Sequence, residues 1–220
     1  DLMLEMFIAL VTFLALSVTA AITLSLIFHD SRQFTKMDKL VLVPIADGSE
    51  EMELSIIIDV LRRAGAKVTV ASVSSNLQID GSRHIKIVAD QLIENIDNNI
   101  QWDLIALPGG MPGASNLSEC NKLIELLKKQ KAEHKLLAAI CASPAVVLNK
   151  HSLLGNEATC YPAKNYIDQL GSKYIDQRVV VDRNIITSQG PATSFEFVLE
   201  LVNQLYGPDK KSELAKQLVL

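Results

Sequence analysis

The stretch Leu137-Ala138-Ala139-Ile140-Cys141-Ala142-Ser143-Pro144 (LAAICASP) decides the fold of this chain. Its apolar half has the length and composition of a strand buried on both faces. The strand ends on a cysteine, and Ser143-Pro144 then has the pattern of a helix start. Free cysteine is often only a small buried apolar residue. A cysteine between a strand and a helix N-terminus is also the arrangement that holds a nucleophile.

The residues around this stretch repeat the same alternation of strands and helices. We expect further strands at 39–45, 67–73, 84–90 and 103–107 and a late hairpin near 178–191. Helices are expected at 50–64, 117–130, 144–150, 193–207 and 210–218. Strands that alternate with helices at this spacing predict a mostly parallel sheet with helices on both faces, a three-layer α/β sandwich.

The composition limits the function classes that are compatible with the chain. It has 220 residues, a formal net charge of −4 and three widely spaced cysteines. This length suits one globular domain, and the charge balance gives no sign of a nucleic-acid surface. The cysteine spacing predicts neither a zinc site nor a disulfide framework, and the sequence calls for no metal and no cofactor.

The N-terminal segment differs from the rest of the chain. Residues 6–28 carry no charged side chain, so we expect 1–30 to be a membrane span or signal-anchor. The first basic residues follow this segment, which predicts a membrane-anchored protein whose domain faces the cytoplasm. A cleaved signal peptide is an alternative, and a soluble cytoplasmic form is another if translation starts at Met37. Residues 31–38 are predicted to be a linker, and 39–220 the domain.

Three features fall at predicted strand ends, where ligands bind in parallel α/β sheets. Cys141 is the candidate nucleophile. Gly109 and Gly110 follow another strand and can offer unobstructed backbone N–H groups, as an oxyanion hole requires. Glu53 lies one turn into a helix, and in a protonated state its carboxyl group can donate a hydrogen bond to a thiolate. Glu50 is interpreted as a residue of the helix start that favours the macrodipole.

Five segments together resemble the ThiJ/PfpI family, and in particular its deglycase branch, which contains the parkinsonism-associated protein deglycase and its bacterial relatives. The segments are ADGSEEMEL, LRRAGAKVTVASV, LPGGMPGASNL, AAICASPAVVL and TSQGPATSFEF. The resemblance implies a flavodoxin-like fold, a homodimer, and activity on glyoxal or methylglyoxal adducts of proteins, with protection against oxidative stress. It also implies a non-enzymatic alternative, a redox sensor or redox-regulated chaperone that uses the same cysteine.

The resemblance also assigns roles to single residues. It implies that Cys141 is the reactive cysteine, that Glu53 is the protonated carboxyl group beside it, and that Gly110 and Ala142 supply N–H groups. Arg83 matches an arginine that lies near the cysteine across the dimer.

Two positions depart from related sequences. Tyr161 stands where human-type members have a histidine, and a phenol is a poor base at neutral pH. Ala142 follows the cysteine where the proteolytic branch has a histidine, so protease activity is not expected.

Overall fold

The computed structural model describes residues 3, 6 and 38–220, and residues 38–220 form one folded unit. The strands are β1 (Leu40–Ile45), β2 (Lys67–Ser72), β3 (Gln78–Asp80), β4 (Lys86–Val88), β5 (Gln91–Leu92), β6 (Leu104–Leu107), β7 (Leu136–Ile140), β8 (Val179–Asp182) and β9 (Ile185–Ser188). The helices are α2 (Glu51–Ala64), α3 (Gly113–Glu119), α4 (Asn121–Ala132), α5 (Lys164–Leu170), α6 (Ser194–Tyr206) and α7 (Pro208–Gln217), with the π-helix η2 (Pro144–Asn149) and 3-10 turns η1 (Ile93–Asn95), η3 (Gly171–Lys173) and η4 (Pro191–Thr193).

Seven strands form the main sheet in the order β5-β2-β1-β6-β7-β9-β8. All neighbouring strands are parallel except β8 and β9, which form the expected antiparallel hairpin. From β1 the chain proceeds to β2 on one side and later returns to β6 on the other. The strand order therefore reverses beside β1, and parallel sheets bind ligands at the carboxyl ends near such a reversal.

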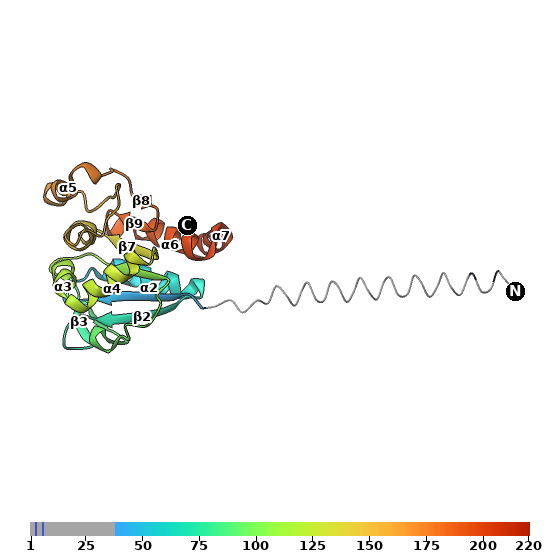
Figure 1. The fold of residues 1–220 in the computed structure, drawn as a ribbon, viewed down its shortest axis with the longest axis horizontal. Helices are drawn as coiled ribbons and strands as arrows, with labels where there is room; N and C mark the ends of the chain where they lie inside the picture. The colour runs from blue at the N-terminus through green and yellow to red at the C-terminus, as the bar shows by residue number, and fades with distance from the viewer. Residues whose placement is uncertain (1–2, 4–5, 7–37) are drawn as a thin grey trace. The chain divides into compact units, whose positions relative to one another are not determined.

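Each face of the sheet is covered by its own group of helices (Figure 1). Leu137 and Ala139 of β7 face an apolar cluster that includes side chains of α3, α4 and η2. Ala138 and Ile140 point the other way, into a cluster with α2, α6 and α7. Because alternate residues of a strand face opposite sides, a strand covered on both faces must be apolar throughout. This explains the continuous apolar character of the quoted stretch and confirms the predicted three-layer α/β fold.

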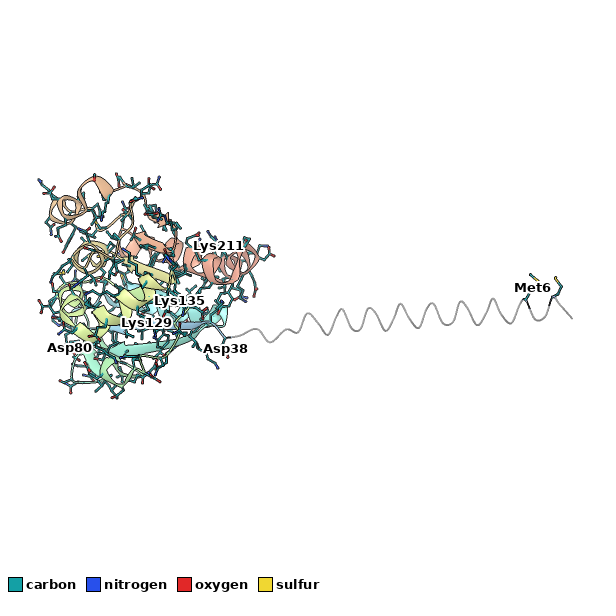
Figure 2. The ribbon with its side chains drawn as sticks, in the orientation of Figure 1. Met6, Asp38, Asp80, Lys129, Lys135 and Lys211 are labelled. Atoms are coloured by element: carbon teal, nitrogen blue, oxygen red, sulfur yellow. The ribbon has the colours of Figure 1, made fainter. Side chains whose placement is uncertain are left out.

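Some predicted elements differ from the observed ones. The helix expected over 117–130 is two helices, α3 and α4, because the backbone at Cys120 is extended. The strand expected over 84–90 is shorter, and it pairs with β3 in a separate two-stranded sheet. An ion pair of 2.7 Å between Lys86 and Asp80 links these two strands. Asp80 lies at the surface of the folded unit (Figure 2). Helix α5 was not predicted, because it has only seven residues, too few for the helical spacing of Tyr166, Ile167 and Leu170 to be distinctive.

The expected membrane-anchored localisation requires a correction. Among residues 3, 6 and 38–220, no helix is both long enough and apolar enough to cross a membrane. The physical reason is that each helix of the folded unit keeps a polar side toward solvent, as helices that cover a sheet do. The segment 1–30 and the linker 31–38 lie outside the described residues, apart from Met3, Met6 and Asp38, so their boundaries stay predictions.

Candidate active site

The predicted site residues meet at the carboxyl ends of β1, β6 and β7. Cys141 directly follows β7, Gly109 and Gly110 follow β6, and Glu53 lies in the first turn of α2, the helix that follows β1. The parallel register brings these three ends to one edge of the sheet, as the sequence predicted.

Cys141 occupies a tight turn between strand and helix. Its φ is +64°, a left-handed conformation that non-glycine residues rarely adopt. Two backbone hydrogen bonds hold this turn: Cys141 N–H donates to the Ser188 carbonyl at 3.0 Å, and Tyr161 N–H donates to the Cys141 carbonyl at 2.7 Å. Such strain persists only where the surroundings fix the backbone, and it is concentrated at functional sites.

Cys141 also lies where the two halves of the core meet. Alone among the described residues, it is a partly buried side chain that packs against both apolar clusters. Ser143, two residues after the cysteine, links this turn to the end of β6, because its buried hydroxyl group donates to the carbonyl of Pro108.

Gly109 lies against both Cys141 and the carboxyl group of Glu53. A Cβ atom at this position would lie 2.4 Å from Cys141 Cβ and 2.9 Å from Glu53 Oε2, so no side chain fits here. Gly109 N–H donates to Glu53 Oε2 at 2.7 Å. This differs from the expected oxyanion role of Gly109, because its N–H group is already engaged by the carboxyl group.

Gly110 and Ala142 direct their N–H groups at the Cys141 sulfur and lower the pKa of the thiol. Gly110 has a φ of +86°, and a Cβ atom there would lie 2.4 Å from the Gly48 carbonyl oxygen. The glycine is thus required both by its conformation and by its close backbone contact. These two N–H groups are the ones that the resemblance implied.

Glu53 and Cys141 share one buried site. Burial raises the pKa of Glu53 from its usual 4.5 to about 7, although hydrogen bonds from Gly109 N–H and from the Cys141 thiol oppose this. Burial also raises the pKa of Cys141, and the adjacent Glu53 carboxylate raises it further. Because two anions in one buried site are strongly disfavoured, the pair retains one proton above pH 7. Glu53 is therefore neutral below about pH 7, and above it the remaining proton resides on Cys141, the pKa of which is raised to about 12.

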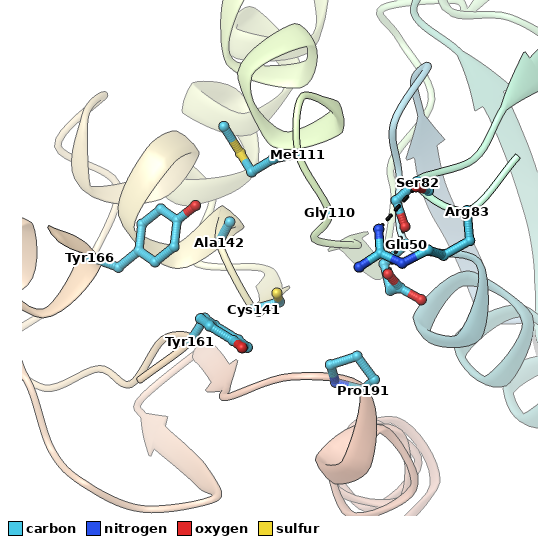
Figure 3. Close-up of a pocket in the computed structure, with 10 residues that line it drawn as sticks. All are labelled: Glu50, Ser82, Arg83, Gly110, Met111, Cys141, Ala142, Tyr161, Tyr166 and Pro191. Carbon is cyan, nitrogen blue, oxygen red and sulfur yellow. Dashed lines mark hydrogen bonds between the residues drawn. The ribbon is translucent and has the colours of Figure 1, made fainter. Parts of the chain in front are cut away.

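A pocket of about 340 Å³ opens beside the sulfur (Figure 3). Its lining residues are Glu50, Ser82, Arg83, Gly110, Met111, Cys141, Ala142, Tyr161, Tyr166 and Pro191. Figure 3 shows Arg83, Glu50 and Ser82 on one side of Cys141, with Tyr166 on the opposite side. Arg83 thus reaches the pocket of its own chain.

Glu51 is not among the predicted site residues, yet it anchors the turn that carries Arg83. The side chain of Glu51 is buried and accepts hydrogen bonds from the N–H groups of Arg83 and Ile85. The Ser82 hydroxyl lies 2.9 Å from Glu51 and 2.7 Å from Glu50. Burial raises the pKa of Glu51, but these hydrogen bonds outweigh burial and hold it below its usual value. The cluster of Glu50, Glu51 and Glu53 at the start of α2 could have indicated this role. Acidic residues at a helix start more often only favour the helix macrodipole, however.

Comparison with known proteins identifies a family and several relatives that this chain resembles. Residues 39–204 match the model of the DJ-1/PfpI family. Protein DJ-1 homolog B of Arabidopsis thaliana is 49% identical over 179 residues, which cover 80% of this chain and 40% of that protein. The chain thus spans less than half of that relative's length. Glutathione-independent glyoxalase DJR-1.2 of Caenorhabditis elegans is 41% identical over 182 residues, 82% of this chain and 95% of that protein.

A solved structure agrees with these sequence matches. The structure of oxidized Toxoplasma gondii DJ-1 has a TM-score of 0.79 and 46% identity, and covers 82% of this chain and 98% of that one. The range matched by the family model includes the cysteine turn, the glycine pair and the buried carboxyl group. The chain belongs to the DJ-1/PfpI family.

Proposed function

We propose that the protein is a cysteine-dependent enzyme of the glyoxalase or deglycase type, acting on glyoxal, methylglyoxal or their adducts with protein side chains. The observation that carries this proposal is the pairing of Cys141 with Glu53, whose pKa of about 7 suits a group that exchanges protons at neutral pH. A relative of similar length is named a glyoxalase, which supports the same reaction class.

The geometry suggests how a reactive carbonyl would be attacked. As the Cys141 sulfur adds to an aldehyde carbon, its proton passes to the Glu53 carboxylate, and the N–H groups of Gly110 and Ala142 stabilise the charge on sulfur. Glu53 then gives this proton to the former carbonyl oxygen, which completes a neutral hemithioacetal. At the end of this step Glu53 is again a carboxylate.

The second half of the proposed reaction, which converts the hemithioacetal, again uses Glu53 as the base. For methylglyoxal, Glu53 removes the proton from the sulfur-bearing carbon and returns it to the neighbouring ketone carbon. The hydroxyl proton on the sulfur-bearing carbon moves to the former ketone oxygen in the same conversion, so the hemithioacetal becomes the thioester of lactate. Water then cleaves the thioester, so that one methylglyoxal and one water give one lactate and the free thiol. The aldehyde carbon is oxidised and the ketone carbon is reduced, so no external oxidant is required. Tyr161 and Arg83 serve as accessory groups that orient the substrate.

Turnover of methylglyoxal and release of a glycated peptide test this proposal. We expect both activities in the unchanged protein, their loss in Cys141→Ser, and a fall of at least about a hundredfold in Glu53→Gln, because general base catalysis contributes this much. If both variants retain the activity of the unchanged protein, the proposal is wrong.

A second candidate function is a redox sensor or redox-regulated chaperone that uses the same cysteine. The observation that favours it is the ring of donors around the sulfur, because Gly110 N–H, Ala142 N–H and protonated Glu53 could stabilise a sulfinate as well as a thiolate. A related solved structure is described as oxidized. A single sulfinate at Cys141 after peroxide treatment, without any methylglyoxal turnover, would favour this function over the first.

We also propose that the protein forms a homodimer. Met52 on α2 and Ile85 and Val88 on the β3–β4 hairpin are exposed apolar side chains, 58%, 58% and 65% accessible. Exposed apolar side chains on adjoining elements are typical of interaction surfaces. Light scattering is expected to give twice the chain mass, and Val88→Glu to return it to the monomer. A monomeric mass for the unchanged protein would exclude the dimer.

A further inference from the structure

The pocket beside Cys141 has two chemically different sides. Arg83, Glu50 and Ser82 form a polar side, and an aromatic side is formed by Tyr161 and Tyr166 (Figure 3). The sulfur lies between them. A substrate that places its carbonyl carbon at the sulfur can therefore direct its remaining substituent toward either side.

The two tyrosine rings are held in a defined arrangement. Their centroids are 6.4 Å apart and their planes meet at 85°, an edge-to-face geometry. The backbone of Tyr161 is bonded to the cysteine turn through its N–H group and the Cys141 carbonyl. Tyr166 N–H donates at 3.0 Å to the Ala163 carbonyl at the start of α5, so each ring has a backbone anchor.

The ring of Tyr161 is positioned but not buried. Its Cδ2 atom lies 3.4 Å from where a Cβ atom of Gly190 would be, so the bare glycine backbone gives the ring a flat surface to lie against. Even so, Tyr161 is 44% exposed. A ring that is fixed on one side and open toward a reactive sulfur has a free face for a ligand.

The volume of the pocket also bears on the substrate. Pockets of about 300 Å³ and more enclose ligands of many atoms. At about 340 Å³, this pocket has room well beyond that needed by a three-carbon dicarbonyl compound. Met111 and the two tyrosines are among the side chains that line this volume.

We infer that Tyr161 and Tyr166 form an aromatic subsite that selects α-oxoaldehydes with an aromatic substituent, the arylglyoxal class. This inference rests on the proposed attack by Cys141 on an aldehyde carbon. The substituent ring packs against the two tyrosine rings in offset or edge-to-face contact, which aromatic rings prefer over contact with aliphatic groups of the same size. The tyrosine that replaces the family histidine thus serves selection of the substrate.

Kinetics with three substrates test the subsite. We expect kcat/KM for phenylglyoxal to exceed that for cyclohexylglyoxal, which has a saturated ring of similar size, by about two- to tenfold after correction for their reactivity with a free thiol. In Tyr166→Leu and in Tyr161→Leu this ratio is expected to approach one. Methylglyoxal turnover changes little in Tyr166→Leu, because Tyr166 takes no part in the proposed reaction.

Two matched controls keep the ring and remove only the hydroxyl group. Tyr161→Phe and Tyr166→Phe are expected to retain the preference for the aromatic substrate. Loss of the preference in these variants, or its retention in both leucine variants, would overturn the inference.

A second measurement does not depend on turnover. Maleimides alkylate a thiol by adding sulfur and a proton across their double bond, so the second-order rates for N-phenylmaleimide and N-cyclohexylmaleimide at Cys141 compare the two rings directly. Peptide mapping after alkylation in a Cys120→Ser background separates Cys141 from the other accessible thiol. We expect the phenyl compound to be favoured, relative to a free thiol, in the parent protein and not in Tyr166→Leu.

The two measurements separate the subsite from the proposed reaction. Preference for the phenyl maleimide without any glyoxal turnover would support the subsite and exclude the reaction. Turnover of methylglyoxal without preference in either assay would support the reaction and exclude the subsite.

Discussion

Replacing Glu53 by glutamine is expected to change how the stability of the protein depends on pH. The side chain of Glu53 is completely buried, and burial raises its pKa from the usual 4.5 to about 7. Between these two values the unfolded chain has lost the proton and the folded chain has kept it, so the unfolded state binds fewer protons. By linkage, the free energy of unfolding then falls as the pH rises through this window.

The size of this effect follows from the two pKa values. The stabilising contribution is fully present below pH 4.5, decreases up to about pH 7 and is lost above it. Each pH unit corresponds to about 1.4 kcal/mol, so the total loss is about 3 kcal/mol. Glutamine is neutral at every pH in this range, so the free energy of unfolding of Glu53→Gln does not decrease in this way. The stability of the variant relative to the unchanged protein is expected to rise by about 3 kcal/mol between pH 4.5 and 8.

Urea unfolding at several pH values between 4.5 and 8 measures this difference. Glu125→Gln makes the same chemical change on an exposed face of α4 and serves as the matched control, with a difference that varies little with pH. If the difference between Glu53→Gln and the unchanged protein is also constant across this range, burial does not control the proton on Glu53, and the reasoning about the pair with Cys141 is refuted.

Three other predictions follow from the site. The value of kcat/KM for methylglyoxal is expected to rise with pH around 7, because Glu53 must be a carboxylate to accept the thiol proton; a flat profile would count against this role. Gly109→Ala is expected to lower the free energy of unfolding by about 1–3 kcal/mol and to slow alkylation of Cys141, since its Cβ would lie 2.4 Å from Cys141 Cβ; calorimetry and mass spectrometry check this. Ser82→Ala removes the hydroxyl group that contacts Glu50 and Glu51, at a cost of about 1 kcal/mol, and faster hydrogen exchange in the β3–β4 hairpin is expected; unchanged exchange would contradict it.

The sequence predicted the main sheet well because its central strands are apolar at every position. A strand covered on both faces must be apolar at every position, and β1, β6 and β7 are. The β3–β4 hairpin was harder, because its strands have only three residues each and pair outside the main sheet. The interruption between α3 and α4 at Cys120 depends on a local backbone conformation, and no glycine or proline in the sequence indicates it.

The location of the candidate site could be predicted from the sequence, but the hydrogen bonds and ring contacts within it could not. A cysteine, a glycine pair and a glutamate at strand ends all pointed to the same edge of the sheet. The use of Gly109 N–H by Glu53 could not be predicted, because it depends on which N–H group faces the carboxyl group once the loops are packed. The edge-to-face contact of Tyr161 with Tyr166 likewise depends on the placement of α5, which the sequence pattern did not reveal.

The contact of Cys141 with both apolar clusters has a practical consequence. A small fluorinated or spin-carrying group attached to this sulfur would sit at the junction of the two layers that sandwich the sheet. Loosening of either layer would alter the signal of a single label. The residue proposed for chemistry is thus also the position from which the mobility of the whole folded unit can be followed in one spectrum.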